Sequence, residues 1–283
     1  MRWRGERESE NVEDRRGMSG GGRVAVGGGI GLILVFVIGL LTGKNPSELL
    51  SMLQDSGTAT EQPAGSRQPR PDDTTAQFIS VVLASTEDVW TNIYRQNGAV
   101  YELPKLQIFE GQTQSACGGA SAAMGPFYCP ADQKVYIDLS FCNELRERFQ
   151  APGNFAVAYV VAHEVGHHVQ NLMGISAKVQ GMRGRVSEAD YNKLSVKLEL
   201  QADFLAGVWA YHANKMRNVL EPGDLEAALT AANAIGDDKL QQEAQGYIVP
   251  DAFTHGTSQQ RMYWFKKGFE TGNLSLGRYD DIR

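Results

Sequence analysis

The chain has 283 residues, of which 42% are hydrophobic and 21% are charged, so its composition allows a buried core. Its formal net charge of −6 argues against nucleic acid as the main partner, because that role requires a basic face. The glycine clusters at residues 20–22 and 27–29 lack the strand–turn–helix setting of a phosphate-binding loop, which argues against nucleotide binding.

The first 75 residues are expected to lie outside the globular body. Residues 24–43 carry no charge, and an uncharged run of this length can cross a bilayer as a helix. A buried core helix would rarely be apolar on every face. A cleavable signal peptide usually has a shorter apolar run and a small-residue cleavage site. We therefore predict one transmembrane helix over residues 24–43.

Basic residues predict the orientation of this span. Six arginines precede it, whereas Lys44 is the only basic residue in the twenty positions after it. Because positive flanks stay inside, residues 1–23 are expected to be a cytoplasmic tail of a single-pass cell-membrane protein whose remaining chain is extracytoplasmic. Residues 44–75 are rich in Ser, Thr, Gln, Pro and Asp and predict a flexible linker. The globular domain would then occupy residues 76–283.

This domain is predicted to have an α+β fold, helix-rich with a small sheet. One amphipathic helix is expected to begin near Thr75 and to end near Gly98. Alternating β-branched and aromatic residues predict strands over 103–109 and 134–141. Cap residues predict further helices over 155–173 after Asn154, 188–216 after Ser187, 222–236 from Pro222, and 258–273 after Thr257 or Ser258.

All three cysteines follow the predicted span, on the side where disulfides persist. Cys117 and Cys129 would close a short loop between two strand ends, and this is the favoured pairing. Cys142 is then expected to be a small buried residue. A zinc site built on cysteines is not expected because the sequence has no C-x-x-C spacing.

The stretch HEVGHH, residues 163–168, contains three of the five histidines of the chain. On a helix, residues four apart lie on one face, so His163 and His167 can bind the same metal ion. Glu164 lies about 100° further round the helix axis, beside the metal position, where a carboxylate can take a proton from water. H-E-x-x-H on a helix is typical of metalloproteases.

A catalytic zinc site normally has a third protein ligand. The segment ELQAD supplies Glu199 as the expected third ligand, and Asp203 as an acceptor for the far nitrogen of a ligating histidine. The alternative is that both acids belong to a solvated helix face. Their neighbours Leu198, Leu200 and Phe204 favour a buried setting instead.

The other histidines are assigned by position. His168 points away from the predicted metal face and is expected to contact the surroundings of a metal ligand or another helix. His212 is expected to be a surface or core residue. His255, near the start of the last helix, is a candidate donor to the oxyanion of peptide hydrolysis, with tyrosines as alternatives. Arg261 is expected to organise this segment.

HEVGHH followed by ELQAD resembles the gluzincin metallopeptidases. The whole chain is similar to the bacterial membrane-anchored neutral zinc metallopeptidases in its opening MRWRGERESENVEDRR, its apolar span, SACGGASAAMGPFYCPADQKVYIDLSF, the zinc helix and THGTSQQR. The resemblance implies a minimal gluzincin fold, zinc as cofactor, the ligands His163, His167 and Glu199, and Glu164 as general base. THGTSQQR is also similar to the H-P-x-x-x-x-R segment of related integral-membrane zinc peptidases, with Gly256 in place of proline.

Together these patterns predict a membrane-anchored zinc metallopeptidase that hydrolyses extracytoplasmic peptides or unfolded proteins. The strand over 134–141 is expected to bind an extended substrate along its edge through main-chain hydrogen bonds. The alternative is a membrane-tethered scaffold or adaptor with structural zinc, which would have no need of Glu164. A zinc hydrolase of a non-peptide bond, such as a cell-wall amide, is a weaker alternative. The sequence does not predict the oligomeric state.

Overall fold

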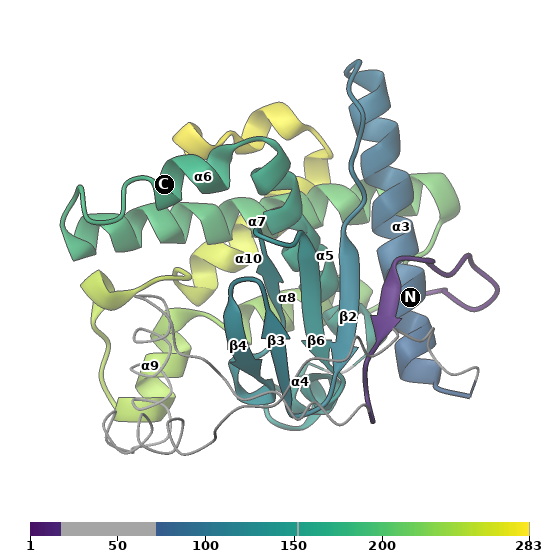
Figure 1. Cartoon of the computed structure of the whole chain (residues 1–283), viewed down its shortest axis with the longest axis horizontal. Coiled ribbons are helices and arrows are strands. Elements are labelled where there is room, and N and C mark those ends of the chain that lie inside the picture. The colour runs from purple at the N-terminus through teal and green to yellow at the C-terminus, as the bar shows by residue number, and fades with distance from the viewer. Residues whose placement is uncertain (18–71, 152, 283) are drawn as a thin grey trace, which may run out of the picture.

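The computed structural model describes residues 1–17, 72–151 and 153–282. Helices predominate in these residues and pack on a small sheet, so the predicted α+β class is confirmed (Figure 1). The predicted membrane span over 24–43 and the linker up to residue 71 lie outside the described residues. Within the described part of the chain, no helix has the length and apolar character needed to cross a membrane.

The helices include the four segments predicted from cap residues and the first amphipathic helix. Their bounds are α3 (Thr74–Gln96), α4 (Ser140–Glu147), α5 (Asn154–Leu172), α6 (Ile175–Gln180), α7 (Glu188–Arg217), α8 (Asp224–Ala234), α9 (Asp237–Gln245) and α10 (Ser258–Thr271). The sequence did not predict the short helices α4, α6 and α9. Single 3₁₀ turns follow at Ala122–Met124, Pro250–Ala252, Leu274–Gly277 and Tyr279–Asp281.

Cap residues explain where the two helices nearest the site begin. The Ser187 hydroxyl accepts a hydrogen bond from the Asp190 N–H and caps α7, as predicted. The expected cap of α5 is wrong by one residue: Asn154 is the first helical residue, and the preceding Gly153 adopts φ 98°, a conformation that favours glycine.

A four-stranded sheet has the order β1 (Val12–Asp14), β2 (Lys105–Phe109), β6 (Lys134–Asp138), β5 (Phe127–Cys129). The predicted strands therefore exist, but the second ends early because residues 140–141 already belong to α4. Side chains on one face of the central strands, such as Leu106 and Val135, are fully buried in the main core with α3 and α5.

β3 (Gln112–Ser115) and β4 (Gly118–Ser121) form an antiparallel hairpin that contacts side chains of the other face of the sheet. The Gln107 side chain donates to Thr113 Oγ1 at 2.7 Å, and the predicted Cys117–Cys129 disulfide ties the hairpin to β5. Cys142 is free and buried, as predicted. Both faces of the central strands β2 and β6 are therefore largely buried.

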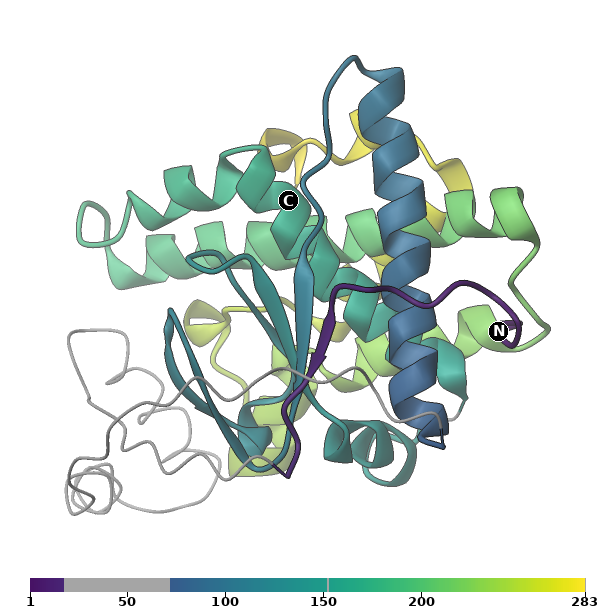
Figure 2. The same cartoon turned by 45° about the vertical axis from the view of Figure 1, so that its right-hand side comes forward.

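The expectation that the first 75 residues lie outside the globular body is wrong for residues 1–17. β1 pairs in parallel with β2, with Glu13 opposite Gln107, and Figure 2 shows this purple segment crossing α3 before it joins the sheet. The buried Glu87 carboxylate of α3 accepts from Arg7 at 2.9 Å and from the Ser9 hydroxyl at 2.5 Å. The N-terminal segment is therefore part of the domain.

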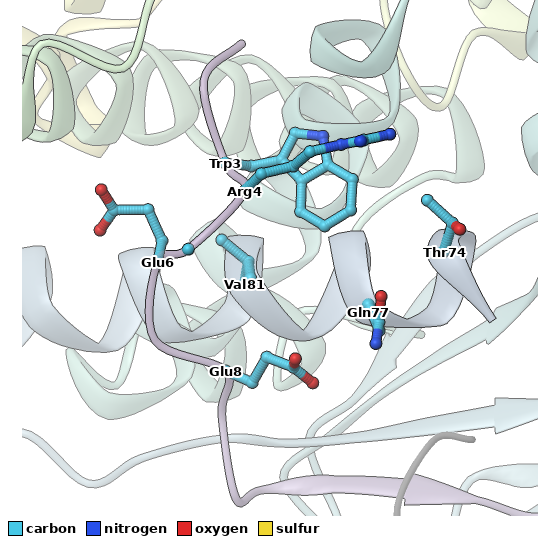
Figure 3. A pocket seen from close by; sticks show the side chains of 8 residues that line it. Trp3, Arg4, Glu6, Glu8, Thr74, Gln77 and Val81 are labelled. Atoms are coloured by element: carbon cyan, nitrogen blue, oxygen red, sulfur yellow. The ribbon is translucent and has the colours of Figure 1, made fainter. Parts of the chain in front are cut away.

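An aromatic contact holds the segment before β1. The Trp3 ring meets Phe78 of α3 edge-on, with centroids 5.5 Å apart. The Arg4 guanidinium lies over the Trp3 ring (Figure 3). A pocket of about 310 Å³ lies beside this contact, and none of its lining residues belongs to the predicted metal site. Residues 1–17 are mostly charged and contain few apolar residues that could indicate packing, which is why the sequence suggested a free tail.

This packing bears on the predicted topology. A single crossing by residues 24–43 would separate residues 1–17 from residues 72–282, yet the two parts share one sheet and one core. The placement of the N-terminal tail in the cytoplasm and of the domain outside the membrane therefore stays a prediction. The contacts of β1 argue against this placement.

We expect a fragment of residues 73–283 to be less stable than one in which residues 1–17 are joined to residue 73 by a Gly/Ser linker. Loss of the segment removes the packing of Val12 and Trp3 and exposes the surface that they cover, including Phe78. This loss costs about 3 kcal/mol in the free energy of unfolding. Urea denaturation of the two fragments measures the difference. Equal midpoints and equal slopes would show that the segment does not dock on the domain.

Candidate metal centre

Two helices meet closely enough to share a metal site because small residues lie at their crossing. Gly166 of α5 faces Ala202 of α7, and a Cβ atom on Gly166 would lie 3.0 Å from the Ala202 carbonyl oxygen. That spacing leaves no room for a larger side chain. The contact brings His163 and His167 of α5 opposite Glu199 of α7.

The three predicted ligands converge. His163 Nε2 lies 3.1 Å from Glu199 Oε2, and His167 Nε2 lies 3.4 Å from Glu199 Oε1. One ligand atom from each residue falls in a group with all separations within 4.8 Å. Two atoms bound to a tetrahedral zinc ion at about 2.1 Å are about 3.4 Å apart, so the donor set and its spacing fit zinc.

Without a metal, protons compensate the buried carboxylates. Burial on its own would lower the pKa of His163, but Asp203 and Glu199 raise it to about 10. Burial would raise the pKa of Glu199, yet His167 and His163 hold it well below its usual value. The site therefore favours positive charge between the imidazoles and Glu199, where a divalent cation can replace protons.

Asp203 contacts the ligand His163, as predicted. Its Oδ1 lies 2.8 Å from His163 Nδ1 and accepts from the Tyr159 hydroxyl at 2.5 Å. The carboxylate is fully buried, and the sequence analysis did not identify Tyr159, whose position one turn before His163 on α5 was the available signal. A carboxylate behind a ligating histidine fixes its ring orientation and tautomer.

Arg261 organises Asp203 rather than the His255 segment. Its Nε donates to Asp203 Oδ2 at 2.9 Å and its Nη2 to Oδ1 at 3.0 Å, in a bidentate pair. The prediction of a local role is therefore wrong, because α10 packs backbone to backbone on α7. A Cβ atom on Gly207 would lie 2.1 Å from the Phe265 carbonyl oxygen.

Glu164 lies beside this group and is buried, with 7% of its surface exposed. Among the described residues, none forms a hydrogen bond with its carboxylate, so both oxygens remain available to a water molecule or substrate. Burial raises the pKa of Glu164 above its usual value, and the nearby His163 and His167 partly offset this effect. A raised pKa brings a carboxyl closer to the range useful for proton transfer at neutral pH.

His255 lies close enough to Glu199 for its charge to act on that carboxylate, and half of its side chain is exposed. Its Nδ1 is 3.0 Å from Asp237 Oδ1, while Asp237 Oδ2 accepts the backbone N–H groups of Thr254, His255 and Gly256. Burial would lower the pKa of His255, but Asp237 and then Glu199 raise it. Asp237, which no sequence motif indicated, therefore holds the His255 ring, and the charge of this ring helps to lower the pKa of Glu199.

The remaining histidines have structural contacts. His168 is fully buried, and its ring nitrogens lie 2.7 Å from the Glu102 carbonyl oxygen and 2.9 Å from the Tyr128 hydroxyl. It joins α5 to β5 and to the segment before β2. His212 Nε2 donates to the Gly272 carbonyl at 2.9 Å, at the end of α10.

The expected substrate edge is wrong. β6 pairs with β2 along its whole length and with β5 over residues 134–136, so most of its main-chain groups are already used. The outer strand on this side of the described sheet is β5, whose Tyr128 contacts His168 next to the ligand His167. The sequence did not indicate β5 because three residues give too short a pattern.

The geometry defines a class of protein. A helix that carries H-E-x-x-H, completed by a glutamate from a second helix, is the arrangement of zinc metallopeptidases. The sequence matches the family described as "Putative neutral zinc metallopeptidase" over residues 1–277, and the chain belongs to this family. The match includes the residues of β1.

Relatives in this comparison include a protein of Escherichia coli (strain K12) named "Uncharacterized protein YpfJ". It is 50% identical over 280 residues, which cover 96% of each chain. "Uncharacterized protein Mb2605" of Mycobacterium bovis is 39% identical over 211 residues, which cover 71% of this chain and 70% of that protein. No solved structure matches the chain.

Proposed function

We propose that the protein is a zinc-dependent peptidase that hydrolyses peptide bonds in peptides or unfolded proteins. The observation that carries the proposal is the convergence of His163, His167 and Glu199 beside a buried carboxylate, Glu164, that no described side chain engages. A purely structural zinc site would normally have four protein ligands. Three ligands and an adjacent base suit catalysis better.

Each residue has a role that follows from its surroundings. Zinc, when bound by the three ligands, supplies a Lewis acid and lowers the pKa of coordinated water to about 7. Glu164 accepts the proton of the attacking water and passes it to the leaving amine. His255, held by Asp237 and half exposed, donates a hydrogen bond to the oxyanion that develops on the carbonyl.

An extended peptide fits the strand β5 better than any buried strand. β5 is an outer strand of the described sheet and is joined to α5 through Tyr128 and His168. Main-chain pairing along such an edge binds many sequences with similar affinity. The substrate class proposed is therefore unfolded or extended polypeptide with loose sequence preference.

Cleavage assays on the full chain test the proposal. We expect casein to be cleaved, cleavage to stop when a zinc chelator removes the metal, and cleavage to return when zinc is added. Peptidoglycan fragments are expected to remain intact. Cleavage of peptidoglycan fragments alone would support an amide hydrolase, and zinc binding without cleavage of either substrate would support a scaffold.

Replacing His255 with alanine is expected to lower kcat by roughly 10²- to 10³-fold, the effect of removing one oxyanion donor. KM and zinc content should change little, because His255 is not one of the three ligands. His212→Ala is the matched control, since that histidine bonds to the end of α10 and is not part of the metal site. An unchanged kcat in His255→Ala would remove His255 from the reaction.

A further inference from the structure

The second expected zinc ligand, His167, has a side-chain partner that no sequence motif indicated. His167 Nδ1, the ring nitrogen that faces away from Glu199, lies 2.8 Å from Gln170 Oε1. Gln170 is three residues further along α5, so the helix places it next to His167. It is fully buried, and no solvent competes for its amide.

The surroundings of Gln170 fix which way its amide points. Its Nε2 donates to the Leu198 carbonyl at 2.7 Å and to Gln201 Oε1 at 3.0 Å. The Leu198 carbonyl can only accept, so the amide nitrogen of Gln170 must face it. Gln170 Oε1 is consequently left to face His167.

The hydrogen bonds of Gln201 favour the same orientation of the Gln170 amide. Its own Nε2 donates to the Gly277 carbonyl at 2.9 Å, so its Oε1 must face Gln170. Hydrogen bonds therefore run in one direction, from His167 through Gln170 and Gln201 to the C-terminal 3₁₀ turn Leu274–Gly277. Both glutamine side chains are at most 2% exposed.

This direction determines the tautomer of His167. Because Gln170 presents an oxygen, His167 must carry its proton on Nδ1, and Nε2 keeps the lone pair that a metal requires. We propose that Gln170 is the positioning residue of His167, and that Leu198 and the Gln201–Gly277 pair hold its amide in the required orientation. The proposal rests on the metal site of the proposed function.

The two zinc histidines are then supported in different ways. His163 is backed by the Asp203 carboxylate, which carries charge, whereas His167 is backed by a neutral amide. Gln170 thus fixes a ring without adding a further negative charge to a site that already contains Glu199, Asp203 and Glu164. Its contribution is to metal affinity and ring geometry.

The first test compares the zinc dissociation constants of Gln170→Met, Gln170→Glu and Gln201→Met, measured by competition with a chromogenic chelator. Gln170→Met removes the acceptor and is expected to bind zinc about 10- to 100-fold more weakly. Gln170→Glu keeps an oxygen toward Nδ1 and is expected to recover most of this loss. Gln201→Met leaves the Leu198 contact and is expected to have an effect smaller than that of Gln170→Met.

Unfolding of the metal-free variants separates positioning from general stability. If Gln170 has a purely structural role, the three variants will lose zinc affinity in the same order as they lose stability without metal. If Gln170→Glu recovers zinc affinity but not stability, the result supports a positioning role. Tight zinc binding by Gln170→Met would overturn the proposal. Failure of the wild type to bind zinc would instead overturn the proposed function.

A measurement on the wild-type protein does not depend on the folding of any variant. In the zinc-loaded protein, ¹⁵N–¹H NMR of the histidine rings shows which nitrogen of His167 carries a proton. A proton on Nδ1, with Nε2 unprotonated, is the expected result. A proton on Nε2 would overturn the assignment of Gln170.

Discussion

Replacing Glu164 with glutamine is expected to lower kcat on casein by about 10²- to 10⁴-fold, the range for losing a general acid–base group. The amide keeps the size of the side chain but cannot accept the proton of water. Zinc content should stay at one ion per chain, because Glu164 is not among the three converging ligands. Metal analysis and steady-state kinetics on the same sample check both expectations.

Glu188→Gln is the matched control for this prediction. This substitution removes the same negative charge at an exposed position at the start of α7. Its activity should equal that of the wild type. If Glu164→Gln kept full activity with zinc bound, Glu164 would not be the base, and the mechanism proposed for the site would be wrong.

Replacing Arg261 with methionine is expected to lower the free energy of unfolding by about 3–5 kcal/mol, the cost of leaving a buried charge without its partner. Arg261 is 3% exposed and its bidentate partner Asp203 is fully buried. Burial on its own would raise the pKa of Asp203, but Arg261 and His163 hold it below its usual value. Urea denaturation of the metal-free protein measures the loss.

Arg148→Met provides the comparison. Arg148 is 56% exposed and lies 4.0 Å from Glu243, so its removal should cost less than about 1 kcal/mol. Equal losses in the two variants would contradict the buried network around Asp203. A large loss only for Arg261 would show that α10 stabilises the metal centre through this pair.

The metal centre could be predicted from sequence because its signals are local. The spacing of His163 and His167 places both on one helix face, and Ser187 marks the start of the helix that carries Glu199. Asp203 follows Glu199 by one turn, so its place behind a ligand was also predictable. The Cys117–Cys129 pairing was favoured by its short loop and is confirmed.

Features that depend on contacts between distant segments could not be predicted. Gln170 becomes a partner of His167 only because Leu198 and Gln201 orient its amide, and Arg261 reaches Asp203 only because α10 packs against α7. Asp237 is 18 residues from His255 in sequence. No pattern within one segment indicates such pairs.

The packing of the N-terminal segment on the domain could not be predicted from the sequence either. β1 has three residues and its partner β2 begins at Lys105, so alternation within β1 is too short to indicate a strand. Residues such as Arg7 and Ser9 suggested a solvated tail, yet they bond to the buried Glu87. Composition describes the segment correctly but does not indicate what it contacts.

Crystals grown with zinc and measured at the zinc absorption edge would show where the metal binds. We expect one strong anomalous peak about 2.0–2.2 Å from His163 Nε2, His167 Nε2 and one Glu199 carboxylate oxygen. A peak elsewhere, or a Glu199 side chain directed away from the two imidazoles, would contradict the proposed metal site.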